Sequence, residues 1–265
     1  MIIKPQEGPQ KQFLESEADI VLYGGGAGGG KTFGLLLDPI RFRNVPGFGG
    51  IIFRRVSTQV RTEGGLWDES EKIYPLVGGV GKESFLQWDF TSSKVTLKFS
   101  HIQYDKDIYN YQGAQIPYIG FDELTHFSRK AFFYMLSRNR SVCGVRPYIR
   151  ATCNPDADSW VAELVEWYID TDENSRTYGL PIPERSGVVR YFVNVNDTLH
   201  WSSNPFELIA KFTPEKWQDD PFNDKNPCKP KSFTFIPATV YDNKLLLEKD
   251  PGYLANLNAL DKVER

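Results

Sequence analysis

The sequence predicts an α/β fold in which a mostly parallel β-sheet is flanked by helices. Short apolar segments at 20–23, 51–53, 116–121 and 148–153 have the length of buried strands, and each ends at glycine or polar residues. Helical patterns follow several of them, an alternation that is typical of parallel sheets. The 265 residues can form one large domain with appendages, which we favour, or two small domains.

The composition is that of a soluble globular protein. Charged residues make up 25% and hydrophobic residues 40% of the chain, and no apolar run approaches the ~20 residues that cross a bilayer. The amino terminus lacks a signal-peptide core, so we expect a cytosolic protein without a membrane partner. A net charge of −3 argues against bulk adhesion to nucleic acid but allows a local basic patch. The scattered Cys143, Cys153 and Cys228 fit a reduced compartment and lack zinc-ligand spacing.

The first apolar segment leads into a glycine-rich stretch, residues 23–32, which reads YGGGAGGGKT. Its spacing is that of a phosphate-binding P-loop, in which Lys31 reaches the β- and γ-phosphates and the Thr32 hydroxyl meets Mg²⁺. A flexible linker is the alternative, but an apolar strand and the helical pattern of residues 33–40 flank the stretch. We therefore predict nucleotide contacts from Gly25, Gly26, Ala27, Gly28, Gly29, Gly30, Lys31 and Thr32.

A helix is also expected before the loop, with Pro9 at its start. Gln10 in this helix could pair its amide with the adenine edge, because the amide carries both a donor and an acceptor. A surface glutamine is an equally good interpretation of the residue type alone.

Basic residues gather after the strand at 51–53. Ligands of open α/β sheets lie at strand ends, so Arg54 and Arg55 are well placed to interact with a phosphate group. With Arg61 they are our candidates for contacts to the DNA backbone, the alternative being a solvated basic surface.

Further elements follow from periodicity. Residues 62–75 predict an amphipathic helix, and alternation over 85–102 predicts a hairpin. Residues 128–138 predict a helix with Ser128 as its N-cap.

The segment 116–121 ends in Asp122-Glu123, the Walker B arrangement. Asp122 would hold the Mg²⁺ shell and Glu123 would orient the attacking water. An acidic pair at a strand end is weak evidence by itself. Together with a P-loop, it favours a role in hydrolysis over an ordinary solvated acidic turn. The neighbouring strand ends at Asn154, whose amide could report the γ-phosphate or could simply belong to a turn before proline.

A catalytic arginine could come from the end of the predicted helix 128–138. Phosphoryl transfer benefits from an arginine that spreads positive charge over the phosphoryl oxygens, and a neighbouring subunit often supplies it. We choose Arg140 over Arg138 for this role, with ordinary surface residues as the alternative.

These motifs together resemble the ATPase domain of tailed-phage large terminase subunits. The resemblance covers nearly the full chain and is thinnest between residues 170 and 229. It is carried by Gln10 and by residues 25–32, 111–114, 119–123, 136–140, 150–155, 232–238, 241–243 and 250–254.

The resemblance implies a RecA-like P-loop fold that hydrolyses ATP with Mg²⁺ and pumps double-stranded DNA into a procapsid in the host cytoplasm. It implies a homo-oligomeric ring on the portal protein, compatible with a monomer in solution, and a small terminase subunit that presents the DNA. The same resemblance implies that Gln10 helps read adenine and that Lys31 and Thr32 hold the phosphates and Mg²⁺. It also implies that Asp122 and Glu123 carry out the metal and water chemistry, and that Asn154 couples ATP hydrolysis to movement.

Two features depart from the family pattern. Many large terminases carry an arginine in the P-loop or shortly before Walker B, and residues 27–29 and 111–113 hold none. Family members continue into a nuclease domain, and this chain stops about where a linker to it would begin. We therefore expect no DNA cleavage, and divide the chain into an ATPase core (1–177), a lid-like subdomain (178–243) and a C-terminal segment (244–265).

Two other functional classes stay open. A helicase-like ATPase shares these motifs but needs a second RecA-like domain, for which 265 residues leave no room. A nucleotide-switched assembly protein would hydrolyse ATP only incidentally, so that Glu123→Gln would have little turnover to remove.

Overall fold

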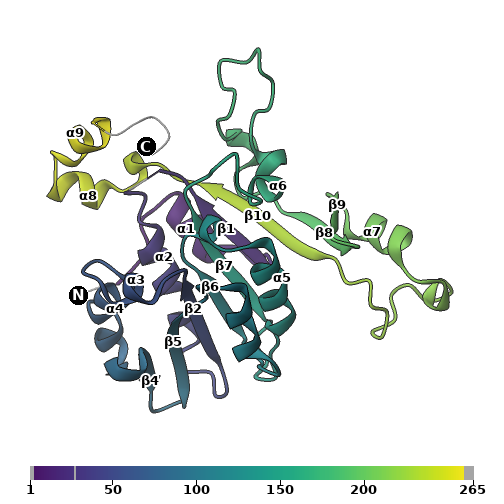
Figure 1. The fold of residues 1–265 in the computed structure, drawn as a ribbon, viewed down its shortest axis with the longest axis horizontal. Helices are drawn as coiled ribbons and strands as arrows, with labels where there is room; N and C mark the ends of the chain where they lie inside the picture. Colours follow the sequence, from purple (N-terminus) through teal and green to yellow (C-terminus); the bar gives the residue numbers. More distant parts are fainter. Residues whose placement is uncertain (1–2, 27, 260–265) are drawn as a thin grey trace.

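A computed structural model describes residues 3–26 and 28–259, and its described strands form one sheet (Figure 1). The strands are β1 (Ile20–Gly24), β2 (Gly49–Arg54), β3 (Val80–Lys82), β4 (Gln87–Phe90), β5 (Val95–His101), β6 (Tyr118–Phe121), β7 (Tyr148–Cys153), β8 (Arg190–Val195), β9 (Thr198–Ser202) and β10 (Lys231–Pro237).

The sheet order is β3-β4-β5-β2-β6-β7-β1-β10-β8-β9. Strands β5, β2, β6, β7, β1 and β10 run parallel to one another, whereas β3, β4, β8 and β9 pair antiparallel at the two margins. The predicted fold, a mostly parallel sheet with helices around it, is confirmed.

Helices cover both faces of the sheet. They are α1 (Pro9–Glu15), α2 (Lys31–Leu37), α3 (Ser57–Arg61), α4 (Leu66–Glu71), α5 (Arg129–Arg138), α6 (Ala162–Val165), α7 (Pro205–Phe212), α8 (Lys244–Lys249) and α9 (Tyr253–Asn258). Helices α1 to α4 pack with one buried cluster, and α5 and α6 pack with the other. Within the described ranges, no helix has the length and hydropathy that a membrane crossing requires.

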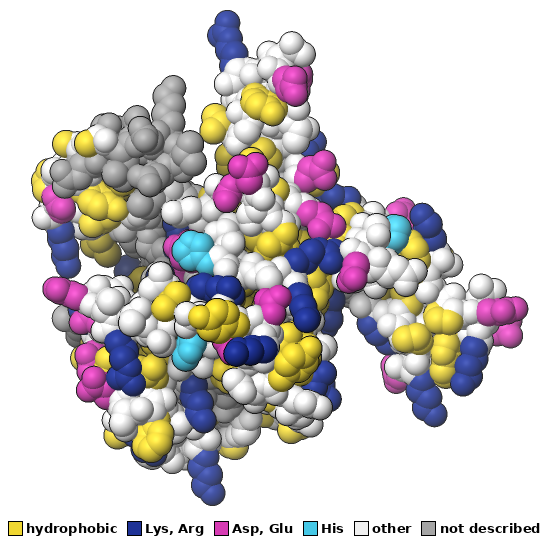
Figure 2. All heavy atoms as spheres, viewed as in Figure 1, with side chains coloured by type: hydrophobic (Ala, Val, Ile, Leu, Met, Phe, Trp, Pro, Cys, Tyr) yellow, Lys and Arg dark blue, Asp and Glu magenta, His cyan; other side chains and the backbone are white. Residues whose placement is uncertain are grey.

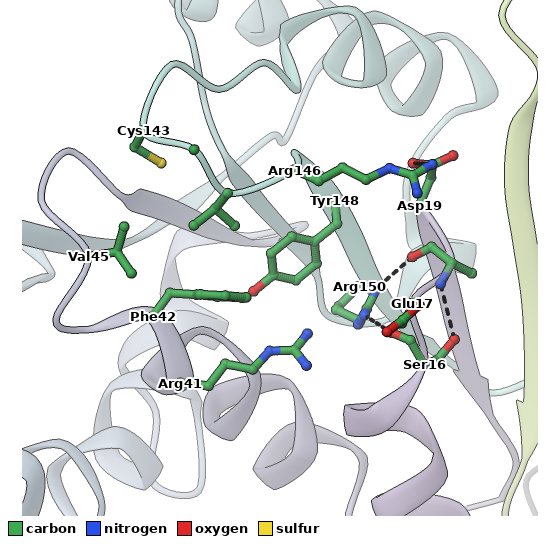
Figure 3. A pocket seen from close by; sticks show the side chains of 13 residues that line it. Ser16, Glu17, Asp19, Arg41, Phe42, Val45, Cys143, Arg146, Tyr148 and Arg150 are labelled. Atoms are coloured by element: carbon green, nitrogen blue, oxygen red, sulfur yellow. Dashed lines mark hydrogen bonds and ion pairs between the residues drawn. The ribbon is translucent and has the colours of Figure 1, made fainter.

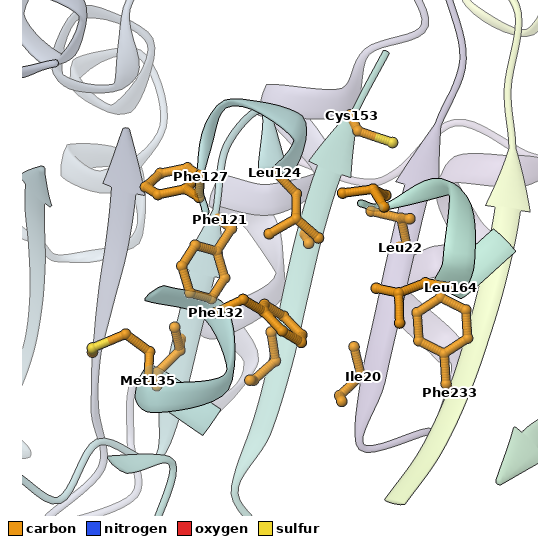
Figure 4. Packing of buried hydrophobic residues seen from close by; sticks show 14 of the residues in the cluster. Ile20, Leu22, Phe121, Leu124, Phe127, Phe132, Met135, Cys153, Leu164 and Phe233 are labelled. Carbon is orange, nitrogen blue, oxygen red and sulfur yellow. The ribbon is translucent and has the colours of Figure 1, made fainter. Parts of the chain in front are cut away.

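The central strands are buried on both faces, as parallel strands between helical layers are. In β1, Ile20 and Leu22 belong to the cluster beneath α5 and α6, whereas Val21 and Tyr23 belong to the cluster beneath α1 to α4. Figure 4 shows the first cluster, with Phe132 of α5 among the labelled side chains. This packing holds the carboxyl ends of β1, β6 and β7 side by side, because the strands are in register.

Most elements lie where the sequence predicts them. The strand β1, the helix α2 and the β4–β5 hairpin are all present, and Ser128 caps α5 by accepting a hydrogen bond from the Ala131 N–H. Helix α2 is followed by a 3₁₀ turn at Asp38–Phe42, because Pro39 has no N–H to continue the α-helical ladder.

The prediction of one amphipathic helix over 62–75 is wrong. Within that range the structure has only the short helix α4 and the start of a 3₁₀ turn at Tyr74–Val77, whereas α3 ends at Arg61. Gly64, between α3 and α4, has a φ of 72°, a left-handed conformation that glycine adopts without strain.

The segment 178–243 contributes β8, β9 and β10 to the same sheet, and β10 pairs directly with β1. Figure 1 shows the β8–β9 hairpin and α7 projecting beyond the body of the molecule. The domain division at residues 177 and 243 and the lid role stay predictions.

Candidate active site

The glycine-rich loop connects the carboxyl end of β1 to α2, which is the context that a P-loop requires. Gly25, Gly28 and Gly30 all have positive φ angles, of 144°, 83° and 70°. A Cβ at Gly25 would lie 1.7 Å from the Ala238 carbonyl oxygen, so only glycine fits there. The loop therefore has the tight backbone path that the sequence predicts; Ala27 lies outside the described residues.

Lys31 lies across this loop and contacts Asn154. Its Nζ donates to the carbonyl oxygens of Gly25 (2.7 Å) and Gly26 (2.8 Å) and to Asn154 Oδ1 (2.7 Å). Burial lowers the pKa of Lys31, while the charges of Glu123 and Asp122 act in the opposite direction. The predicted phosphate-binding lysine and the strand-end asparagine are thus joined directly.

Asp122 is fully buried at the end of β6, where three side chains converge on it. Thr152 Oγ1 donates to its Oδ1 at 2.7 Å, and Thr32 Oγ1 lies 3.4 Å from the same oxygen. Arg54 donates from Nε to Oδ2 at 2.6 Å. Thr152 and Arg54 are site residues whose roles here the sequence did not predict.

Glu123 follows in a left-handed conformation with a φ of 62°. This is uncommon for a residue other than glycine and is found at functional sites. Its backbone N–H donates to Thr152 Oγ1 (3.0 Å), and its Oε2 accepts from the Asn154 N–H (3.3 Å). The backbone turn directs the carboxylate toward Asn154, hence toward Lys31 and the loop.

The donor set fits Mg²⁺. This ion takes oxygen ligands, typically one or two carboxylates together with phosphates and water. The Thr32 hydroxyl and the Asp122 carboxylate lie close enough to share one ion. Among the described residues, no group of three or more His, Cys, Asp or Glu side chains could hold a metal ion by itself.

Gln10 is buried against the loop. Its Nε2 donates to the Gly30 carbonyl (3.0 Å) and its Oε1 accepts from the Gln6 N–H (2.7 Å). A cavity of about 240 Å³ beside it is also lined by Phe33 and Asn243. The amide therefore supports the loop, and Gln6 and Asn243 are neighbours that no local pattern indicated.

The three arginines predicted to contact DNA differ in their surroundings. Arg54 forms an ion pair with Asp122 in the candidate site. Arg55 donates to the Ile102 carbonyl (3.1 Å), and Arg61 lies 3.9 Å from Glu83. On the face drawn in Figure 2, Lys and Arg side chains are scattered among acidic and neutral ones. The DNA contacts of all three arginines stay predictions.

The family follows from a comparison with known proteins. The chain matches the family model "Terminase large subunit, T4likevirus-type, N-terminal" over residues 22–265. This chain belongs to that terminase family. No curated protein matches it in sequence.

Solved terminase structures share its fold. The ATPase domain of the large terminase of Thermus phage P74-26 is 12% identical, with a TM-score of 0.53 over 98% of this chain and 90% of that domain. The large terminase of a thermophilic bacteriophage, in complex with ATP-gamma-S, is 12% identical, with a TM-score of 0.51 over 96% of this chain and 49% of that one. In another crystal form of that thermophilic phage terminase, 15% identical with a TM-score of 0.49, the match covers 62% of this chain but only 44% of that chain.

Within this terminase chain, Arg140 lies far from the loop. It donates to the Ala114 carbonyl (3.1 Å), and the adjacent Asn139 side chain binds the carbonyls of Ile116 and Pro117, before β6 begins. The P-loop lies at the opposite, carboxyl ends of the strands. A six-residue strand such as β7 is about 20 Å long, which is the approximate separation of the two ends. Arg140 therefore cannot serve this chain's own site.

Proposed function

We propose that the chain is the ATP-hydrolysing domain of a viral DNA-packaging motor. The observation that carries the proposal is the direct link from Lys31 through Asn154 to Glu123, beside a buried Asp122. The P-loop would hold the phosphates, and Thr32 and Asp122 would hold Mg²⁺. When bound, the ion would neutralise charge on the β- and γ-phosphates.

Glu123 is the group that would orient the attacking water. Its carboxylate faces the strand-end Asn154 and is not engaged by Arg54, which binds Asp122. ATP phosphates would compete with the loop carbonyls and Asn154 for Lys31 Nζ. Release of Asn154 from Lys31 would then couple nucleotide binding to the loop after β7.

The remaining parts of the proposal concern partners. We propose double-stranded DNA, a portal protein and a small terminase subunit as partners, and a ring of copies of this chain in the host cytoplasm as the working assembly. Arg140 lies near the amino ends of the strands, away from the P-loop of its own chain. We therefore propose that it acts as the catalytic arginine in the site of a neighbouring copy.

The test is phosphate release from Mg²⁺·ATP by the purified chain at several protein concentrations. We expect Glu123→Gln to abolish ATP turnover but to retain nucleotide binding, and Lys31→Ala to lose both turnover and binding. Glu71→Gln, at an exposed position on α4, is the control and should behave as wild type. A turnover rate per chain that rises with protein concentration would support a catalytic arginine supplied by a neighbouring copy. Turnover indifferent to Glu123→Gln would refute the water-positioning role and favour a nucleotide switch.

A further inference from the structure

Arg54 binds the same carboxylate that the proposed chemistry assigns to Mg²⁺. It is the last residue of β2, the strand next to β6, and its Nε and Nη2 both lie 2.6 Å from Asp122 Oδ2. The Arg54 side chain is 18% exposed and that of Asp122 is 0% exposed. The contact is therefore a close, nearly dry ion pair inside the site.

A buried carboxylate requires a compensating charge, because its ionised form is strongly disfavoured away from water. Of the two cations in the site, Lys31 is engaged by the loop carbonyls and Asn154, so Arg54 is the one that neutralises Asp122. Lys31 begins α2 directly after the loop, and Arg54 holds Asp122, whose Oδ1 lies 3.4 Å from the hydroxyl of Thr32 next to the loop. Both cations therefore lie beside the loop that would hold the phosphates.

Arg54 and Mg²⁺ cannot both hold Asp122 Oδ2 in this arrangement. A divalent cation at this carboxylate replaces the charge that Arg54 supplies and repels the guanidinium. Guanidinium groups pair with phosphate oxygens as readily as with carboxylates, since both accept two parallel N–H bonds.

We propose that Arg54 is the internal counter-ion of Asp122 in the nucleotide-free site, and that Mg²⁺·ATP displaces it toward the phosphates. This inference rests on the proposed ATPase function. It makes Arg54 a second phosphate-facing cation supplied by β2 within the same chain, in a site whose P-loop contains no arginine. Until displaced, Arg54 keeps Asp122 neutralised and in place.

The decisive measurement is the affinity for Mg²⁺ in the presence of saturating ADP, compared between wild type and Arg54→Gln. The glutamine removes the competing charge, so apparent Mg²⁺ affinity should rise, by about tenfold if Asp122 is free of Arg54 one-tenth of the time. The exposed Arg176→Gln is the matched control and should leave it unchanged. Unchanged or weaker Mg²⁺ binding by Arg54→Gln would overturn the proposal.

Thermal unfolding gives a second readout that a purely structural ion pair would not share. Without ligand, Arg54→Gln should melt below wild type, and Mg²⁺·ADP should remove most of the difference because the ion now neutralises Asp122. If the melting temperature of Arg54→Gln lies equally far below that of wild type with and without Mg²⁺·ADP, the ion pair is purely structural. That result would refute the displacement of Arg54. Arg54→Lys, which keeps a cation in case the glutamine variant folds poorly, should show Mg²⁺ affinity between the two.

Turnover tests the second half of the proposal. At saturating Mg²⁺·ATP, Arg54→Gln should lower the rate and Arg54→Lys should restore part of it. An unchanged rate would remove the phosphate role. If wild type hydrolyses no ATP while Arg54→Gln still binds Mg²⁺·ADP more tightly, the ATPase proposal fails and the counter-ion role survives.

Discussion

At the scale of single residues, Thr152 organises the acidic pair. Its hydroxyl donates to Asp122 Oδ1 and accepts the N–H of Glu123, so one buried side chain fixes both the carboxylate of the first residue and the backbone of the second. A threonine in an apolar strand reads as an ordinary β-branched residue, which explains why its role was not predicted from the sequence.

Replacing this hydroxyl gives a testable prediction. Thr152→Val keeps the shape but removes the donor to Asp122 Oδ1 and the acceptor of the Glu123 N–H, which typically destabilises by about 1–3 kcal/mol. Urea unfolding should show this loss, and ATP turnover should fall because Glu123 is no longer held. Thr152→Ser, which keeps the hydroxyl, should retain most of both; equal losses in the two variants would contradict the assigned contacts.

Cysteine chemistry gives a second prediction at this scale. Cys153, at the end of β7, is fully buried, and burial raises the pKa of its thiol to about 12, whereas Cys143 is half-buried. Because the thiolate is the reactive form, a thiol reagent at pH 8 should modify Cys143 and spare Cys153 in the native protein. Peptide mass spectrometry would identify the labelled residue; rapid labelling of Cys153 without unfolding would show that the strand end is open.

At the scale of elements, α5 is set at its first residue by a short polar network. Ser128 Oγ accepts from the Ala131 N–H at 3.1 Å and donates to Asp105 Oδ1 at 2.6 Å. The helix carries Phe132 and Met135 into the core, so its start determines which side chains reach β6.

Loss of this cap should cost about 1 kcal/mol, the typical value for a serine N-cap. We expect Ser128→Ala to lower the free energy of unfolding by about that amount, and Ser128→Asp, which still caps the helix but meets the carboxylate of Asp105, not to restore it fully. The check is chemical denaturation monitored by circular dichroism. No change in Ser128→Ala would show that water replaces the cap.

A second element-scale feature lies at the amino ends of β1 and β7, away from the P-loop. Figure 3 shows a cavity there, about 620 Å³ in volume, with Tyr148 and Arg150 on its wall. The buried Arg150 guanidinium donates to the Ser16 and Ala18 carbonyls, and its Nε lies 3.5 Å from the buried Asp38. It thereby ties β7 to the end of α1.

Without the guanidinium, Asp38 keeps its pair with Arg41 (2.9 Å), but the Ser16 and Ala18 carbonyls lose their donor, which typically destabilises by about 1–3 kcal/mol. We predict this loss for Arg150→Ala in urea unfolding. Arg146→Ala, whose side chain is largely exposed although it pairs with Asp19, should lose less. Equal effects would mean that burial does not set the strength of these pairs.

At the scale of the whole molecule, segments from both ends of the chain close over the P-loop. Asn243 Nδ2 donates to the Gly28 carbonyl (2.6 Å), and its Oδ1 accepts from Gln6 Nε2 (2.8 Å). A Cβ at Gly28 would meet the Tyr253 ring at 2.7 Å, so α9 also lies against the loop. Residues 237 positions apart thus meet beside the proposed nucleotide site.

Asn243→Ala should therefore weaken ADP binding without unfolding the protein. We expect roughly fivefold to tenfold lower affinity, equivalent to one lost hydrogen bond of about 1 kcal/mol or slightly more. Titration with a fluorescent ADP analogue measures it, and Asn194→Ala, at an exposed position on β8, is the control. Equal affinity in the two variants would show that the closure contributes nothing to binding.

The sequence by itself determined the fold class, the strand that precedes the P-loop, the acidic pair after β6 and the asparagine after β7. These signals are local, because each depends on a short apolar run and on the residue types directly after it. Parallel strands then place their carboxyl ends at one edge, so Lys31, Asp122, Glu123 and Asn154 meet there once the sheet forms.

The tertiary structure decided which side chains face that edge from elsewhere. Arg54 reaches Asp122 across 68 residues because β2 pairs with β6. Arg140 does not reach the site of its own chain, because α5 ends near the amino ends of the strands. The contacts of Gln6 and Asn243 likewise depend on how distant segments pack. Strand order and register arise from non-local pairing and burial, and no local pattern of residues contains them.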